Sequence, residues 1–180
     1  MDNKKIVYYE NELDDEFSKA KIEPLTIDEN YPYFHGYVWD FCSFLIQNLI
    51  SMPIKIGYAK LKFHLKFIGK EKLKECKNSG YFIYANHTQE FADTFIPSLA
   101  NFPKRNFFVV NPENVSMKGL TKLVPLLGAI PVPGNLKAAR HFMEMIQKRI
   151  EEKRSITIYP EAHIWPYYTK IFCRSSGNRR

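Results

Sequence analysis

The sequence predicts a single α/β domain with a largely parallel or mixed sheet flanked by helices. Short apolar runs that suit strands alternate along the chain with longer segments whose apolar residues recur at helical spacing. The chain has 180 residues, of which 45% are hydrophobic and 25% charged, so it can bury one hydrophobic core. Strands that alternate with helices favour parallel pairing, and such sheets bind ligands at the carboxyl ends of their strands.

Charge divides the chain into an acidic lead-in and a basic body. Residues 1–30 hold nine acidic and four basic side chains, and they lack the apolar core of a secretory signal. The rest of the chain holds ten acidic and 22 basic side chains. A basic body attracts anionic lipid, phosphorylated substrates or nucleic acid, although a solvated lysine-rich surface would have the same composition. The three cysteines are far apart, which argues against disulfides.

The segment 31–60 is predicted to contain an amphipathic helix that contacts a membrane. Its most apolar stretch, 37–56, has apolar residues at helical spacing: Val38, Phe41, Cys42, Leu45, Leu49 and Met52. Asp40 argues against an uninterrupted membrane span. Lysines at 55, 60, 62, 66 and 70 give the apolar face a basic flank, which suits an anionic leaflet. Packing of this face on the protein's own core is the alternative.

The remaining elements follow from local patterns. Phe63, Leu65 and Phe67 alternate with polar neighbours, which predicts a half-buried strand, and a turn at 78–80 precedes a buried strand over 81–85. Further strands are expected over 107–110, 129–132 and 155–159. Helices are expected over 90–101, 116–127 and 137–153, the last because its apolar residues form one stripe.

Three short segments that follow predicted strands carry the candidate chemistry: 86–93 (NHTQEFAD), 128–132 (GAIPV) and 159–163 (YPEAH). Six residues along one continuous helix would leave two side chains about 120° apart. His87 and Asp93 therefore meet only if His87 lies in the loop and Asp93 points back from the helix. A histidine oriented by a carboxylate suits a general base that acts on a hydroxyl. A satisfied loop histidine beside a locally packed aspartate is the alternative.

The order of these segments resembles the glycerol-3-phosphate and lysophosphatidate acyltransferase family, over about Leu65 to Lys170. That family has a His-x4-Asp block beginning with Asn-His, a Gly-containing block ending in Arg, and a Phe-Pro-Glu-Gly-Thr block. The resemblance implies that His87 takes the proton of the acceptor hydroxyl while Asp93 orients His87. The alkoxide would attack the thioester of acyl-CoA or acyl-carrier protein, with no cofactor beyond this co-substrate and no metal. Residues expected to bind substrate are Asn86, Thr88, Lys137, Arg140, Pro160 and Glu161.

The chain departs from the family pattern at four places. Five residues instead of four separate His87 from Asp93, and the arginine after the glycine block is absent, so Lys137 or Arg140 would replace it. Ala162 and His163 stand in place of Gly-Thr. A late Val-Pro block is missing, so we expect a C-terminally truncated member whose acyltransferase domain, 61–171, precedes a polar tail at 172–180.

The expected partners are a lysophospholipid or glycerol-phosphate acceptor, the acyl donor and the cytoplasmic face of a membrane. A non-catalytic lipid-binding protein remains the alternative function. No nucleic-acid-binding motif, Gly-x-Ser-x-Gly motif or paired metal-ligand spacing occurs in the sequence. We therefore expect no nucleic-acid partner, and neither a serine hydrolase nor a metal site.

Overall fold

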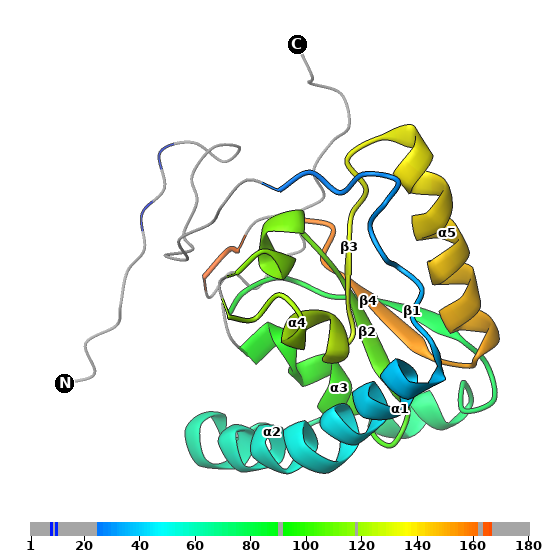
Figure 1. The fold of residues 1–180 in the computed structure, drawn as a ribbon. Helices are drawn as coiled ribbons and strands as arrows, with labels where there is room; N and C mark the ends of the chain where they lie inside the picture. Colours follow the sequence, from blue (N-terminus) through cyan, green and yellow to red (C-terminus); the bar gives the residue numbers. More distant parts are fainter. Residues whose placement is uncertain are drawn as a thin grey trace.

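The computed structural model describes Tyr8, Glu10 and residues 25–89, 92–117, 119–161 and 164–166. Within these residues four strands form one sheet: β1 (Tyr81–Tyr84), β2 (Asn106–Val110), β3 (Ala129–Pro131) and β4 (Ser155–Ile158). The strand order is β1-β4-β2-β3, and every neighbouring pair is parallel (Figure 1). The predicted single α/β domain is confirmed, with a sheet that is parallel in all the strands described.

Helix α5 (Leu136–Glu151) packs on one face of this sheet. It begins at Asn135, whose side chain accepts a hydrogen bond from the Ala138 N–H at 2.8 Å and so satisfies a free donor of the first turn. The apolar core that α5 shares with the sheet consists of Ile27, Tyr33, Phe107, Val115, Ile130, Met145, Ile146 and Ile156. The predicted helix over 137–153 is thus confirmed within one or two residues at its ends.

Helix α3 (Ile96–Asn101) lies on the opposite, polar side of the sheet. Asn101 donates from Nδ2 to Ser155 Oγ at 2.9 Å, and Asn106 donates from Nδ2 to Thr157 Oγ1 at 2.9 Å. Because side chains alternate along a strand, the apolar side chains of β4 face α5 while its hydroxyls face α3. The buried polar groups on this side are therefore paired with each other, as buried polar groups must be.

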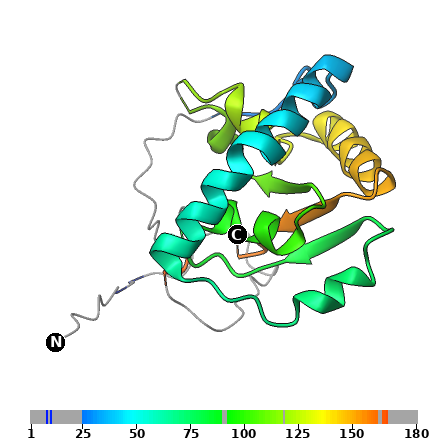
Figure 2. The ribbon, with the colours of Figure 1, turned by 90° about the horizontal axis from the view of Figure 1, so that it is seen from below.

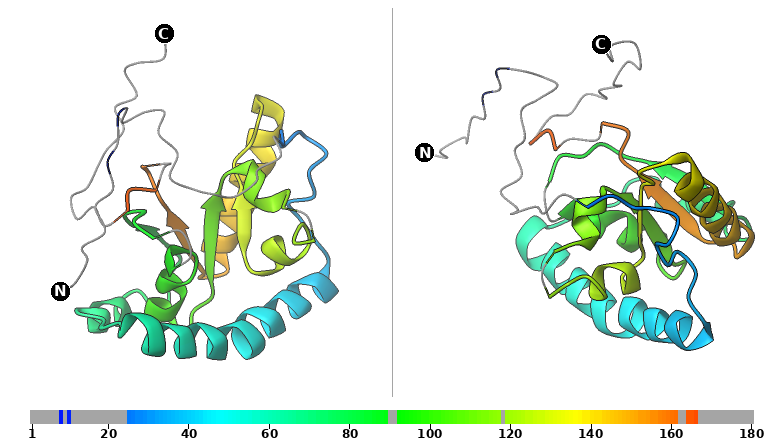
Figure 3. Two further views of the ribbon diagram at one scale, coloured as in Figure 1. Left: turned by 90° about the vertical axis from the view of Figure 1, so that its left-hand side faces the viewer. Right: turned by 45° about the horizontal axis from the view of Figure 1, so that its top comes forward.

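A long N-terminal helix runs across one side of the molecule (Figures 2 and 3). It consists of α1 (Tyr37–Leu45), the π-helical segment η1 (Ile46–Ser51), α2 (Met52–Tyr58) and the π-helical segment η2 (Ala59–Phe63). The predicted helix over 37–56 is confirmed and extended. It ends at His64, which has a left-handed backbone with φ of 49°. The predicted strand over 63–67 is therefore wrong, because the helix continues to Phe63 and non-strand backbone follows.

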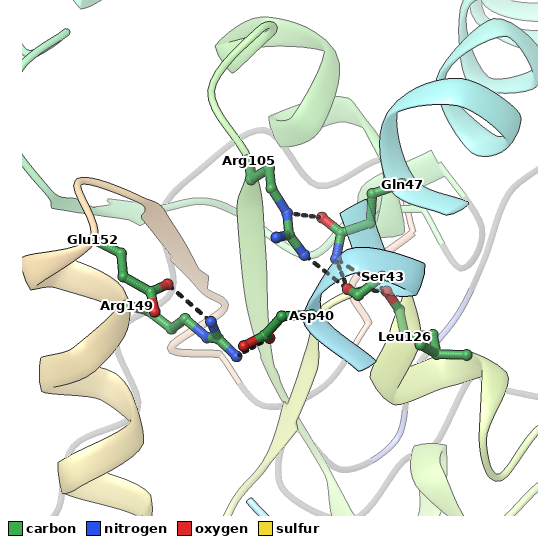
Figure 4. A network of polar contacts seen from close by, with 7 residues as sticks. All are labelled: Asp40, Ser43, Gln47, Arg105, Leu126, Arg149 and Glu152. Atoms are coloured by element: carbon green, nitrogen blue, oxygen red, sulfur yellow. Dashed lines mark hydrogen bonds and ion pairs between the residues drawn. The ribbon is translucent and has the colours of Figure 1, made fainter. Parts of the chain in front are cut away.

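Buried polar side chains join this helix to the amino end of β2 (Figure 4). Arg105 donates from Nε to Gln47 Oε1 at 3.2 Å and from Nη2 to Ser43 Oγ at 2.7 Å. Ser43 and Gln47 in turn donate to the carbonyl of Leu126, at 2.7 and 3.0 Å. The helix is thus fixed to the residues that precede both β2 and β3.

A second buried arginine, Arg149 of α5, extends this network. It pairs with Asp40 at 3.2 Å and with Glu152 at 2.8 Å. The guanidinium groups of Arg149 and Arg105 lie 4.6 and 5.2 Å from the ring centre of Phe107, within range of a cation–π contact. Burial lowers the pKa of Arg105 to about 10, which still leaves the group charged at neutral pH.

The long helix carries its polar side chains inward and its large apolar side chains outward. Ser43 and Gln47 are only 3% and 5% exposed. The exposed apolar side chains, here called the outer apolar face, are Tyr37, Val38, Phe41, Phe44, Leu49, Ile50, Ile54, Ile56 and Leu61. Met52, predicted to share the apolar stripe, is instead buried against the protein. Among the described residues, no helix has both the length and the apolar character needed to cross a membrane.

Three other elements differ from the sequence-based expectations. The helix over 90–101 is divided into the 3-10 turn η4 (Ala92–Thr94) and α3, and residues 90 and 91 lie outside the described residues. The helix over 116–127 is reduced to α4 (Leu123–Leu126), which follows the left-handed backbone of Gly119. Strand β1 is not fully buried, because it lies at an edge of the described sheet. The domain boundaries at residues 30, 60 and 171 stay predictions.

Lys55 gives a pH-dependent test of the packing of the long helix. It lies between Met52 and Ala59 on the inward face, and burial lowers its pKa from 10.5 to about 8. Between pH 8 and pH 10.5 the unfolded chain therefore binds more protons than the folded chain, so stability rises with pH in this window. At neutral pH the buried charge of Lys55 destabilises the fold, and this penalty disappears as the pH rises through about 10.

We expect Lys55→Met to raise the free energy of unfolding by about 1–3 kcal/mol near neutral pH, with a difference that shrinks towards pH 10. Urea unfolding across this pH range measures the effect. Lys60→Met, at an exposed position of the same helix, serves as the control. An equal gain in both variants, or one that does not change with pH, would contradict the assignment.

Candidate active site

The pairing of β1 with β4 brings two of the sequence segments together. Tyr84 is in register with Ile158, and the Ala85 N–H donates to the Ile158 carbonyl at 3.2 Å just past the end of β1. Because the strands are parallel, the segments 86–89 and 159–161 leave the sheet at the same edge. Residues that are about 75 positions apart in the sequence thus become neighbours at the carboxyl ends of the strands.

His87 and Asp93 form a hydrogen-bonded pair at this edge. His87 Nδ1 lies 2.9 Å from Asp93 Oδ2, and the side chains are 22% and 8% exposed. A carboxylate only accepts hydrogen bonds, so Nδ1 carries the proton and Nε2 of the neutral ring keeps its lone pair. The extra residue between His87 and Asp93, compared with the family block, does not prevent this contact.

The Asp93 carboxylate also organises the loop that carries His87. Its Oδ2 atom accepts from the N–H groups of Thr88 at 2.6 Å and Gln89 at 2.8 Å, besides His87. Such charge-assisted bonds to backbone are stronger than neutral ones and hold the carboxylate in place. The two N–H groups consequently donate to Asp93 instead of to a substrate phosphate or an oxyanion.

The segment after β4 holds the backbone of His87 from both sides. Glu161, which is 2% exposed, accepts from the His87 N–H with Oε2 at 2.8 Å. The Trp165 N–H donates to the His87 carbonyl at 2.7 Å. Glu161 therefore lies beside His87, as the order of the sequence blocks predicted, and it contacts the backbone of the His87 loop. Pro160, the preceding residue, is exposed.

Tyr159 contacts both members of the histidine–carboxylate pair, and sequence reasoning did not single it out. Its ring stacks on the His87 ring with 4.7 Å between centroids and 30° between planes. Its hydroxyl donates to the backbone carbonyl of Asp93 at 2.5 Å. Burial, with a smaller contribution from Asp93, raises the pKa of Tyr159, so the phenol remains a proton donor. Its place at the aromatic position of the third block was the available signal.

The structure places the other sequence candidates less decisively. Asn86 and Thr88 flank His87 in its loop. Lys137 and Arg140 lie on the first turns of α5, where they are 81% and 82% exposed and pair with Glu29 and Glu144. Within the described residues neither has a recorded contact with the His87 pair. Ala162 and His163 lie outside the described residues.

Gly128 of the second block has a structural role in the sheet. Its φ is +100°, and a Cβ atom there would lie 3.1 Å from the Asn106 carbonyl oxygen. The Gly128 carbonyl accepts from the Phe108 N–H at 2.9 Å. Glycine is therefore needed for the close approach of β3 to β2. Within the described part of the chain, no three His, Cys, Asp or Glu side chains are grouped to hold a metal ion.

The parallel sheet has a histidine–carboxylate pair at the carboxyl ends of its strands, which is where α/β proteins of this kind generally bind ligands. A family model described as Acyltransferase matches residues 64–176, which is more than half of the chain. The chain therefore belongs to the acyltransferase family, and the expected transferase class is confirmed at that level. Searches of curated proteins and of solved structures gave no match.

Glu161 can be tested as the partner of the His87 backbone. Glu161→Gln keeps an oxygen that can accept from the N–H, whereas Glu161→Leu leaves this donor without it. We expect the Leu variant to be less stable than the Gln variant by about 1–3 kcal/mol, the usual cost of an unsatisfied buried donor. Chemical denaturation of both variants measures this difference, and equal stability would contradict the assigned contact.

Proposed function

We propose that this chain transfers a fatty acyl group from acyl-CoA or acyl-carrier protein to the hydroxyl of a glycerophospholipid precursor such as lysophosphatidate. Membership of the acyltransferase family supports the reaction class. The observation that carries the mechanism is the 2.9 Å contact between His87 and Asp93, which leaves the other ring nitrogen of His87 free to accept a proton.

In the proposed reaction, His87 Nε2 removes the proton of the acceptor hydroxyl. The oxygen attacks the thioester carbonyl, and collapse of the tetrahedral intermediate breaks the C–S bond. The imidazolium returns its proton to the thiolate that leaves. Asp93 stabilises the imidazolium and holds the tautomer. No covalent acyl-enzyme and no cofactor beyond the acyl donor are required.

We propose that the acceptor lies between the His87 loop and the start of α5. Asn86, Thr88 and Pro160 border His87, while Glu161 acts by holding the loop. Lys137 and Arg140 would bind the phosphate. Both residues follow β3, and β3 lies three strand spacings, or about 14 Å, from β1 in the sheet. Their long side chains can span part of that distance. Their ion pairs are highly exposed and so weak that a phosphate could displace the carboxylates.

The direct test is the purified chain mixed with oleoyl-CoA and lysophosphatidate, with phosphatidate measured as the product. We expect His87→Ala to lower the rate at least about 100-fold because the proton acceptor is lost. His141→Ala, on α5, is the matched control and should keep the wild-type rate. Equal activity of wild type and His87→Ala would reject His87 as the base. Binding to vesicles without any turnover would favour a non-catalytic lipid-binding protein instead.

We further propose that the outer apolar face of the long helix rests on the cytoplasmic face of an anionic membrane. The support is the reversed polarity of the helix, since the polar side is fixed to the sheet through Arg105 while bulky apolar side chains are exposed. Lys60 and Lys62 at its C-terminal end are exposed as well and complement anionic headgroups. A membrane would also supply the acceptor lipid.

Vesicles of phosphatidylcholine and phosphatidylglycerol in equal parts test this surface. We expect the double variant Leu49→Glu, Ile54→Glu to weaken vesicle binding about tenfold or more, since two side chains that are 70% and 66% exposed would no longer enter the lipid. Leu136→Glu changes a leucine on α5 that is 92% exposed, and it should leave binding unchanged. The proposal would be contradicted if neither variant lost vesicle binding, or if both variants lost it equally.

A further inference from the structure

We propose that Tyr159 is a positioning residue that raises the effectiveness of His87 as a base through two separate contacts. One contact is the stack of its ring on the imidazole, and the other is the bond from its hydroxyl to the Asp93 carbonyl. This inference rests on the proposed function, in which His87 becomes positively charged during the reaction. The residue directly after β4 would thus assist the reaction through contacts that neither His87 nor Asp93 provides.

The ring contact acts on the charge of His87. At 4.7 Å and 30°, the two rings lie nearly face to face. The face of an aromatic ring is electron-rich and attracts a cation, so the contact favours the imidazolium over the neutral ring. It also covers one side of the imidazole, which leaves the edge with Nε2 for the acceptor hydroxyl.

The hydroxyl contact acts on the geometry of the pair. The Asp93 carbonyl belongs to the 3-10 turn η4, whose carboxylate orients His87. The donor, in the residue directly after β4, fixes this peptide, and β4 is itself held between β1 and β2. Tyr159 thus ties the turn with the carboxylate to the strand beside the His87 loop.

The effect of the Tyr159 ring on His87 can be separated from the effects of the nearby carboxylates. Within the described part of the chain, the charged groups that contact His87 are the Asp93 carboxylate from η4 and Glu161 from the segment after β4. Glu161 contacts the backbone N–H of His87, while Asp93 contacts the ring. Removal of the Tyr159 ring therefore changes the stabilisation of the imidazolium without removal of either carboxylate.

Two variants separate the contacts. Tyr159→Phe keeps the ring and loses the hydroxyl, so we expect kcat to fall about threefold to tenfold with KM unchanged, because one neutral hydrogen bond is lost. Tyr159→Leu loses both, so kcat should fall further. The acid limb of its kcat/KM profile should also move to lower pH, by up to about one unit, because the imidazolium loses the aromatic face. Tyr81→Phe, which removes another part-buried tyrosine hydroxyl bond, is the control and should retain full kcat.

An NMR titration of the His87 ring gives a readout that does not need turnover. We expect the His87 pKa to be unchanged in Tyr159→Phe and lowered in Tyr159→Leu. An unchanged pKa in Tyr159→Leu, or equal loss of kcat in Tyr159→Phe and Tyr81→Phe, would overturn the proposal and leave Tyr159 with a purely structural role. Absence of turnover in the wild type, together with the expected pKa change, would instead reject the proposed function alone.

Discussion

The parallel pairing of β1 with β4 is the constraint on which the candidate site depends. It sets Tyr84 beside Ile158, so that the loop with His87 and the segment with Tyr159 and Glu161 leave the sheet together. The two segments hold each other in place, because Glu161 accepts from the His87 backbone N–H, and Tyr159 contacts both the His87 ring and the turn that carries Asp93. A change of register by one residue would reverse the direction of every side chain on β4 and separate these groups.

The long helix shows how a second constraint determines what the molecule exposes. Arg105 and Arg149 are buried charges, which are costly unless every polar group around them is paired. The helix provides Asp40, Ser43 and Gln47 as partners, and these polar residues occupy its inward face (Figure 4). Among the described residues, Arg149 Nε is left without a hydrogen-bond partner. Its bulky apolar residues must then point outward, where a lipid surface would remove them from water. The fold and the proposed membrane contact thus follow from one arrangement of side chains.

The sequence predicted the parts of the fold that depend on local patterns. The strands near 81–85, 107–110, 129–132 and 155–159 were located correctly, because short apolar runs bounded by turns are distinctive. The strand over 63–67 was wrong, since alternation over five residues could not show that the preceding helix continues to Phe63. Strand order and the edge position of β1 depend on distant contacts, so a single sequence does not contain them in readable form.

The candidate site was predictable where sequence blocks marked it. His87 and Asp93 meet, and Glu161 lies beside them. The contact of Trp165 with His87 is made by its backbone, which has no residue-specific signal. Lys137 and Arg140 were chosen for charge and chain position, and both form exposed ion pairs, so their part in phosphate binding stays a proposal.

Asp93→Asn tests the central claim most directly, since it keeps the size of the side chain but removes the charge that fixes the His87 tautomer and stabilises its imidazolium. The measurement is the initial rate of acyl transfer to lysophosphatidate, with thermal unfolding recorded for the same sample. We expect a folded protein whose rate is lower by about 100-fold or more. A folded Asp93→Asn variant with a rate close to that of the wild type would contradict this expectation.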